Sequence, residues 1–187
     1  MDSKLQIISG QYRGHRLFLP PDARPTQNRA RIALFNMLES GIIKDPNAEM
    51  IIWDAFAGSG AFGIECLSRY PRAKVIFTDN AYSSVATVRR NLSMLRIGSW
   101  AEVMHRDAIG SVKQFAPDVN IVFIDPPYDH PNLGKSFMKH FLRVVKKGTI
   151  LIWEQEVGSE IEPDTKKWAI LRDKVYGRAR FLILQKI

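Results

Sequence analysis

A short segment after the fourth apolar run of the sequence combines a carboxylate, two prolines and an aromatic ring. Asp125, Pro126, Pro127 and Tyr128 directly follow the apolar stretch at 120–124. Because proline cannot donate to a strand ladder and fixes its own φ, the two prolines are expected to end a buried strand and stiffen the loop. The Asp125 carboxylate, the Pro126 carbonyl and the Tyr128 ring would then lie together at one edge of a sheet. A proline-rich turn with a capping aspartate and a surface tyrosine is the alternative.

The exocyclic amine of a nucleic-acid base is a substrate that suits this segment. Such an amine is a poor nucleophile, because its lone pair is delocalised into the ring. Acceptors beside its two protons, here Asp125 and the Pro126 carbonyl, favour a pyramidal nitrogen and stabilise the positive charge that develops on it. Tyr128 would stack on a base that has left its helix or loop. The remaining contribution is the in-line alignment of nitrogen, methyl and sulfur, so we expect no metal.

Three further segments follow apolar runs and could hold a nucleotide-like cofactor. The stretch 54–63 fits G-x-G-x-x-G, in which glycines permit a tight turn and a close approach to a ligand, although several nucleotide-binding folds share this spacing. Asp79 could accept hydrogen bonds from ribose hydroxyls, and Asp107 from an adenine amino group. A plain strand-to-helix turn, a solvated loop acid and a helix cap are the alternatives at these places.

Apolar runs and helix-length segments alternate from residue 50 onward. The runs span 50–53, 74–78, 101–104, 119–124 and 149–153, and the helical segments span 60–69, 82–96, 108–115 and 132–146. Alternation of this kind predicts a parallel sheet with helices on both faces, joined by right-handed crossovers in a doubly wound α/β fold. Two last strand-like runs, 167–171 and 178–186, are expected to close the sheet as an antiparallel pair. The carboxyl ends of the parallel strands would bring the segments above to one edge.

The N-terminal segment carries much of the positive charge. A β-hairpin is expected from runs at 5–8 and 16–19, followed by a helix that Thr26 caps and that runs to about Ser40. We expect residues 1–40 to form an RNA-binding appendage and 41–187 the catalytic domain, although a solvated charged face is the alternative. The basic residues between positions 4 and 31 are Lys4, Arg13, Arg16, Arg24, Arg29 and Arg31. A second basic run, for which a solvent face is the commoner outcome, comprises Lys135, Lys139, Arg143, Lys146 and Lys147.

Composition narrows the class of protein. The chain has 187 residues, a formal net charge of +8 and a pI near 9.7, and such an excess favours a polyanionic partner. One cysteine, Cys66, allows neither an internal disulfide nor a cysteine cluster for zinc. The four histidines are scattered, which argues against a metal site. No apolar run reaches membrane-spanning length, so we expect a cytoplasmic protein without a membrane partner.

Taken together, these motifs resemble the RsmD-type bacterial 16S ribosomal RNA (guanine-N2)-methyltransferases, a family of class I, Rossmann-like enzymes. The resemblance covers almost the whole chain and rests on the segments 8–14, 24–26, 29–36, 54–60 and 125–128. It implies a mostly parallel seven-stranded sheet, S-adenosylmethionine as donor, a monomer, and 16S rRNA or the small ribosomal subunit as substrate, at the position called guanine-966. Family members often carry Glu at the place of Asp79, which would give this chain a shorter reach to the ribose.

The resemblance assigns roles residue by residue. Catalysis is expected from Asp125, Pro126, Pro127 and Tyr128. Cofactor contacts are expected from Asp54, Phe56, Ala57, Gly58, Ser59, Gly60, Asp79, Asn80, Asp107 and Ala108. RNA contacts are expected from Arg13, Arg16, Arg24, Thr26, Arg29 and Arg31.

Other classes of protein stay open at this point. A DNA adenine-N6 methyltransferase would share the donor site and the Asp125–Tyr128 segment, although 187 residues leave little room for a target-recognition region. A nicotinamide-dependent oxidoreductase is compatible with the glycine loop and Asp79, but leaves Asp125 and its neighbours unexplained. A non-catalytic RNA-binding module is the third alternative.

Overall fold

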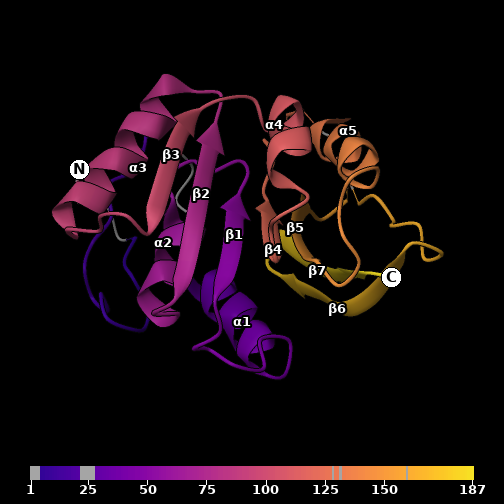
Figure 1. Ribbon diagram of the computed structural model, residues 1–187, viewed down its shortest axis with the longest axis horizontal. Helices are drawn as coiled ribbons and strands as arrows, with labels where there is room; N and C mark the ends of the chain where they lie inside the picture. Colours follow the sequence, from indigo (N-terminus) through magenta and orange to yellow (C-terminus); the bar gives the residue numbers. More distant parts are fainter. Residues whose placement is uncertain (1–4, 22–27, 128, 131, 159) are drawn as a thin grey trace.

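Seven strands form one twisted sheet in the order β3-β2-β1-β4-β5-β7-β6 (Figure 1). The computed structural model describes residues 5–21, 28–127, 129–130, 132–158 and 160–187. Neighbouring strands are parallel from β3 to β5, whereas β7 runs antiparallel to both β5 and β6. The strands are β1 (Met50–Asp54), β2 (Ala73–Asp79), β3 (Ala101–His105), β4 (Ile121–Ile124), β5 (Ile150–Glu156), β6 (Trp168–Tyr176) and β7 (Ala179–Lys186).

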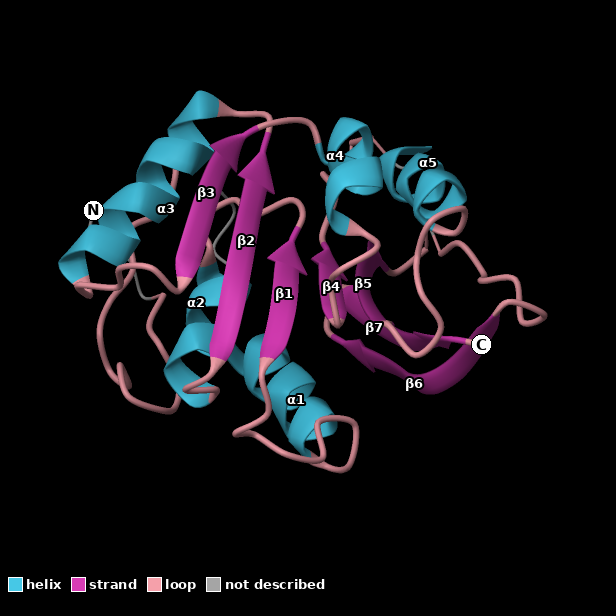
Figure 2. Ribbon diagram, in the orientation of Figure 1, coloured by secondary structure: helices cyan, strands magenta, loops and turns pink. Residues whose placement is uncertain are grey.

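Helices cover both faces of this sheet (Figure 2). On one face lie α1 (Asn28–Glu39), α2 (Ala61–Arg69) and α3 (Tyr82–Met94), and on the other α4 (Ala108–Phe115) and α5 (Asn132–Phe141). The chain therefore has the predicted α/β architecture, with a mostly parallel seven-stranded sheet between two helical layers.

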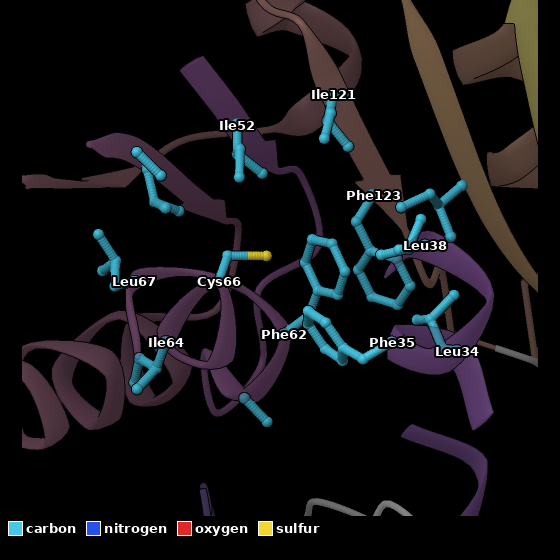
Figure 3. Packing of buried hydrophobic residues seen from close by; sticks show 14 of the residues in the cluster. Leu34, Phe35, Leu38, Ile52, Phe62, Ile64, Cys66, Leu67, Ile121 and Phe123 are labelled. Carbon is cyan, nitrogen blue, oxygen red and sulfur yellow. The ribbon is translucent and has the colours of Figure 1, made fainter. Parts of the chain in front are cut away.

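Each face of the sheet has its own hydrophobic core, because successive strand residues point to opposite faces. Ile52, Phe123 and Ile152 pack beneath α1 and α2, whereas Trp53 and Trp153 pack beneath α4 and α5. In the first core, Phe35 of α1 stacks on Phe62 of α2, and Phe62 stacks on Phe123 of β4 with 4.2 Å between ring centroids (Figure 3). Near-continuous apolar strands, buried on both faces, are typical of parallel sheets.

The predicted elements are confirmed, with two differences in extent. The last helix ends at Phe141 rather than near 146, and its continuation is a series of turns that leads to Gly148. The final antiparallel pair is longer than predicted, because β6 continues to Tyr176. Residues 170–172 contain an irregularity in the ladder, and charged side chains on this edge strand conceal its strand pattern in the sequence.

The predicted N-terminal hairpin is confirmed in part. Only one isolated antiparallel bridge forms, between Gln6 and Arg16, although the chain does turn back on itself. Backbone bonds join the two arms, from Ile7 to the His15 carbonyl, from Gly14 to the Ile7 carbonyl and from Leu17 to the Leu5 carbonyl, whereas donors near the turn bind helix α2. Ile8 and Ser9 donate to the Glu65 carboxylate at 2.8 and 2.9 Å. At Gly10, with φ 82°, an added Cβ would lie 1.9 Å from the Ser68 carbonyl oxygen, so the turn packs directly against helix α2.

The N-terminal segment also belongs to the main core. Leu5, Ile7 and Leu17 are buried in the same cluster as the sheet, together with Leu34 and Phe35 of α1. The described part of the expected appendage, residues 1–40, therefore contributes to the same core as the catalytic domain. The Thr26 cap lies outside the described residues, as do Arg24 and Tyr128. In the part of the chain that the structure describes, we find no helix of the length and apolarity that crossing a membrane requires.

Candidate active site

The carboxyl ends of β1, β2 and β4 meet at one edge of the sheet and carry the predicted acids. Asp54 is the last residue of β1, Asp79 the last of β2, and Asp125 follows β4 directly. In the register, Asp54 lies beside Phe77 of β2 and Phe123 of β4. The fold therefore brings together three acids that are far apart in the sequence.

The glycine loop turns sharply between β1 and α2. Gly60 has φ 77° and precedes the helix without a side-chain cap. Ala57 donates to the Thr78 carbonyl at 3.0 Å, and the buried Thr78 hydroxyl donates to the Ala55 carbonyl at 2.9 Å, so the loop is joined to β2. Gly63 permits close packing of α2 on the sheet, because an added Cβ would lie 2.3 Å from the Phe77 ring.

Asp79 binds backbone N–H groups of two loops. One carboxylate oxygen accepts from Gly58 and the other from Ala81, both at 2.8 Å. The residue is partly exposed and stays beside the glycine loop. These bonds orient the carboxylate, and each oxygen retains a lone pair for a ribose hydroxyl.

Asp54 has the most unusual surroundings of the predicted residues. It is buried, one oxygen accepts from the Gly63 N–H at 3.1 Å, and the other has no hydrogen-bond partner among the described residues. Burial raises the pKa of Asp54 to about 8, the Gly63 N–H lowers it, and the charge of Asp79 raises it. A buried acceptor without a donor indicates that a ligand is required to complete the site.

Asp125 lies close to two other acidic side chains, Glu154 and Asp54. Loss of water around its carboxyl raises the pKa of Asp125 well above its usual value, and the charges of Glu154 and Asp54 raise it further. Pro126 is buried and Pro127 is exposed, and the Pro127 carbonyl accepts from the His130 N–H at 3.0 Å. β4 ends at Ile124, directly before this segment, as its two prolines predict.

Other predicted cofactor residues line the same edge. Phe56 is partly buried and its ring meets that of Phe137, while the buried Ser59 accepts at its carbonyl from the Asn91 amide. The Asn80 carbonyl accepts from the His105 ring at 2.9 Å.

Asp107 accepts from the Gly110 N–H at 2.6 Å and is the N-cap of α4, which was the alternative expected for this residue. Ala108, the first residue of α4, is buried.

The arginines predicted to contact RNA differ in their exposure to solvent. Arg13, Arg16 and Arg29 are exposed. Arg31 is buried, with 4% of its side chain exposed, and it donates to the Gln6 carbonyl and pairs with Glu65 at 3.9 Å. A buried guanidinium cannot reach an RNA phosphate, so the predicted contact at Arg31 is wrong. Its charge instead joins α1 to α2 and the N-terminal segment.

Three residues of structural importance were missed from the sequence. Glu154 follows the fifth apolar run, 149–153, and the strand-end rule that selected the other acids would have found it. Asn91 is fully buried and connects the glycine loop to Phe18 in both directions, accepting from its N–H and donating to its carbonyl. Glu65 binds the N-terminal backbone. No local pattern distinguishes Asn91 or Glu65 from ordinary helix residues.

The residues at this edge fit S-adenosylmethionine. The unpartnered Asp54 oxygen and the neighbouring acids suit a ligand that carries a sulfonium and an ammonium group. The space beside Gly58 is open, since an added Cβ would meet nothing within 4 Å. No three metal-binding side chains converge in the described part of the chain, so these acids do not form a metal-ligand cluster.

Known proteins are similar to this chain over nearly its full length. Residues 5–185 match the family model described as conserved hypothetical protein 95. "Ribosomal RNA small subunit methyltransferase D" of Escherichia coli K12 is 32% identical, over 98% of this chain and 90% of that protein, and the protein of the same name from Haemophilus influenzae is 30% identical, over 97% and 94%. The solved structure of yhhF from Escherichia coli superposes with a TM-score of 0.80 at 32% identity, covering 97% of each chain. The chain therefore belongs to the RsmD family and has the Rossmann-like class I methyltransferase fold.

Proposed function

We propose that the protein transfers a methyl group from S-adenosylmethionine to the exocyclic N2 amine of a guanine in small-subunit ribosomal RNA, at the position called guanine-966. The ribosomal substrate follows the names of its relatives, and the guanine and its position follow the family resemblance. The observation that carries the proposal is the position of Asp125, which continues β4 on the same face as Asp54, whose second carboxyl oxygen has no hydrogen-bond partner among the described residues.

We assign cofactor binding and base binding to different residues of the site. Asp54, the glycine loop and Asp79 would hold the cofactor, with Asp107 and Ala108 at its adenine. When bound there, the cofactor supplies an electrophilic methyl group on a positively charged sulfur. Asp125 and the Pro126 carbonyl would accept hydrogen bonds from the two N–H groups of the amine and hold the nitrogen in line with that methyl group. Tyr128 would stack on the base.

A substitution at Asp125 tests the chemical role. Asp125→Ala removes both acceptor oxygens of the side chain. We expect methyl transfer to fall at least ~100-fold, because an acceptor for developing charge is lost. Calorimetry is expected to show that S-adenosylmethionine still binds. Full turnover by this variant would refute the acceptor role.

Mapping tests the substrate. Methylated nucleotides in small-subunit RNA from cells with and without this gene are compared by primer extension and mass spectrometry. We expect one N2-methylguanine to disappear with the gene. Loss of an N6-methyladenine in DNA, with ribosomal RNA unchanged, would establish the adenine-methylating alternative instead. The proposal further places the enzyme in the cytoplasm as a monomer.

A further inference from the structure

Glu154 belongs to the same row of acids as Asp54 and Asp125. Ile124 of β4 pairs with Trp153 of β5, so the next residues, Asp125 and Glu154, lie opposite each other. Adjacent strands are about 4.8 Å apart, which places the two side chains as neighbours. The charge of Glu154 acts on the Asp125 carboxyl, as expected for such a pair.

The alternation of side chains puts all three acids on one face of the sheet. Asp54 follows Ile52, Asp125 follows Phe123, and Glu154 follows Ile152, in each case two residues further along the chain. Those three apolar residues belong to the core under α1 and α2. Asp54 is at the cofactor end of this row, Asp125 is in the middle, and Glu154, which is partly exposed, is on the far side.

Two neighbouring carboxylates match the donors of one base. The Watson–Crick edge of guanine presents the N2 amine and the N1–H side by side, and both are donors. Adenine presents its amine beside N1, which is an acceptor and would face a carboxylate unfavourably. A site that is built to bind a donor strongly rejects an analogue that lacks it.

We propose that Glu154 accepts a hydrogen bond from guanine N1–H while Asp125 accepts from the N2 amine, and that Glu154 thereby selects guanine over bases with an acceptor at N1. Glu154 is then a specificity-determining residue. It contacts the base from β5, the strand next to β4, whose end carries Asp125 at the reacting nitrogen. This inference rests on the proposed function, since it assumes methylation of an exocyclic base amine in RNA.

The test uses 2-aminopurine, which keeps the 2-amine of guanine but has an acceptor at N1. A synthetic RNA with the mapped nucleotide as guanine or as 2-aminopurine is given to the wild-type enzyme and to Glu154→Gln. We expect wild type to prefer guanine at least ~100-fold in kcat/KM. Because glutamine can donate to N1, the variant is expected to lose most of that preference, to below about 10-fold, with slower transfer to guanine.

Glu156→Gln is the matched control. It makes the same change two residues further along β5, at a side chain that pairs with Arg178. We expect it to keep the wild-type preference for guanine. Thermal unfolding of each variant verifies its fold, and Glu154→Ala, which should also lose the preference for guanine, replaces Glu154→Gln if that variant does not fold.

The outcomes separate this inference from the proposed function. If wild type methylates guanine but Glu154→Gln keeps the full preference, or wild type accepts 2-aminopurine equally well, the role of Glu154 is overturned and the proposed function stands. If wild type methylates no guanine in this RNA and no N2-methylguanine in ribosomal RNA depends on the gene, the proposed function and the role of Glu154 both fall. Loss of the preference in Glu154→Gln alone supports the inference.

Discussion

The acids at the carboxyl edge show how one residue type takes different roles in different surroundings. Asp107 and Asp79 bind backbone N–H groups, whereas Asp54 keeps one buried oxygen without a partner among the described residues. Asp125 and Glu154 lie beside each other and repel when both are ionised. A cationic ligand would relieve the electrostatic cost of this arrangement, which makes the free enzyme less stable than its bound form.

The raised pKa of Asp54 predicts how the stability of the free protein depends on pH. Its pKa is 3.8 without burial and about 8 in the folded protein, so the folded state retains the proton longer. The contribution to stability is therefore complete below about pH 4 and is lost as the pH rises towards 8, by at most ~1.4 kcal/mol per pH unit. Besides Asp79, the acids facing this carboxyl include Asp125.

Asp54→Asn removes this titration, so it should be increasingly favourable relative to wild type as the pH rises. Urea unfolding of both proteins at pH 5 and pH 8, without cofactor, measures the difference in free energy of unfolding. The prediction fails if that difference is the same at both pH values.

Among the elements, α2 has the largest structural role, because the cofactor loop precedes it and the N-terminal segment binds its C-terminal half. Glu65 is fully buried and accepts from Ile8, Ser9 and Arg69, and Arg69 in turn pairs with Glu39 and lies over the Phe35 ring. This network fixes the N-terminal segment against the helix without a β-ladder.

We expect Glu65→Gln to destabilise the protein by ~3 kcal/mol, because it removes the charged partner of the buried Arg31 guanidinium and one of the two that Arg69 has. Glu49→Gln breaks the exposed pair with Arg72 and should cost less than ~1 kcal/mol. Denaturant titration of the two variants compares a buried pair with an exposed pair. Equal losses would mean that burial of Glu65 does not matter.

The packing of α2 on β2 depends on Gly63. Its methyl group in Gly63→Ala would overlap the Phe77 ring, so we expect a loss of ~1–3 kcal/mol and weaker binding of S-adenosylmethionine as the glycine loop shifts. Gly98→Ala, where the added Cβ meets nothing within 4 Å, is the control for the same change. Thermal unfolding and calorimetry with the cofactor distinguish the two, and similar melting temperatures would contradict the packing argument.

At the scale of the whole molecule, two basic surfaces are candidates for binding the proposed RNA substrate. One is the N-terminal surface with Arg13 and Arg16, and the other is the α5 surface with Lys135 and Lys139. The N-terminal segment packs on α2 and α3 and is joined through Asn91 to the glycine loop, which favours it as the RNA-binding surface.

Charge reversal on each surface tests this preference, since both double variants change the net charge equally. Arg13→Glu with Arg16→Glu should weaken RNA binding ~10-fold or more and reduce the salt dependence by about one for each lost phosphate contact, with cofactor affinity unchanged. Lys135→Glu with Lys139→Glu should have a smaller effect. Filter binding at several salt concentrations measures both, and the reverse order would move the RNA-binding surface to α5.

Local patterns were sufficient for the order of the elements and for most of the strand-end residues. Alternation of apolar runs with helical segments is a property of neighbouring residues, and parallel strands put their carboxyl ends at one edge. Asp54, Asp79 and Asp125 could therefore be predicted to lie together. The packing of the hairpin on α2 could not be predicted in the same way, because Ile8 and Ser9 donate to Glu65, a residue more than fifty positions away.

The sequence alone determined the doubly wound fold, the glycine loop and the acid–proline–proline segment, because each depends on short-range spacing. Only the tertiary structure decided that Arg31 is buried, that Asp54 has an oxygen without a partner among the described residues, and that Glu154 stands beside Asp125. Burial and register are set by contacts between distant segments, and a charged residue has the same letter whether it faces water, a buried partner or a substrate.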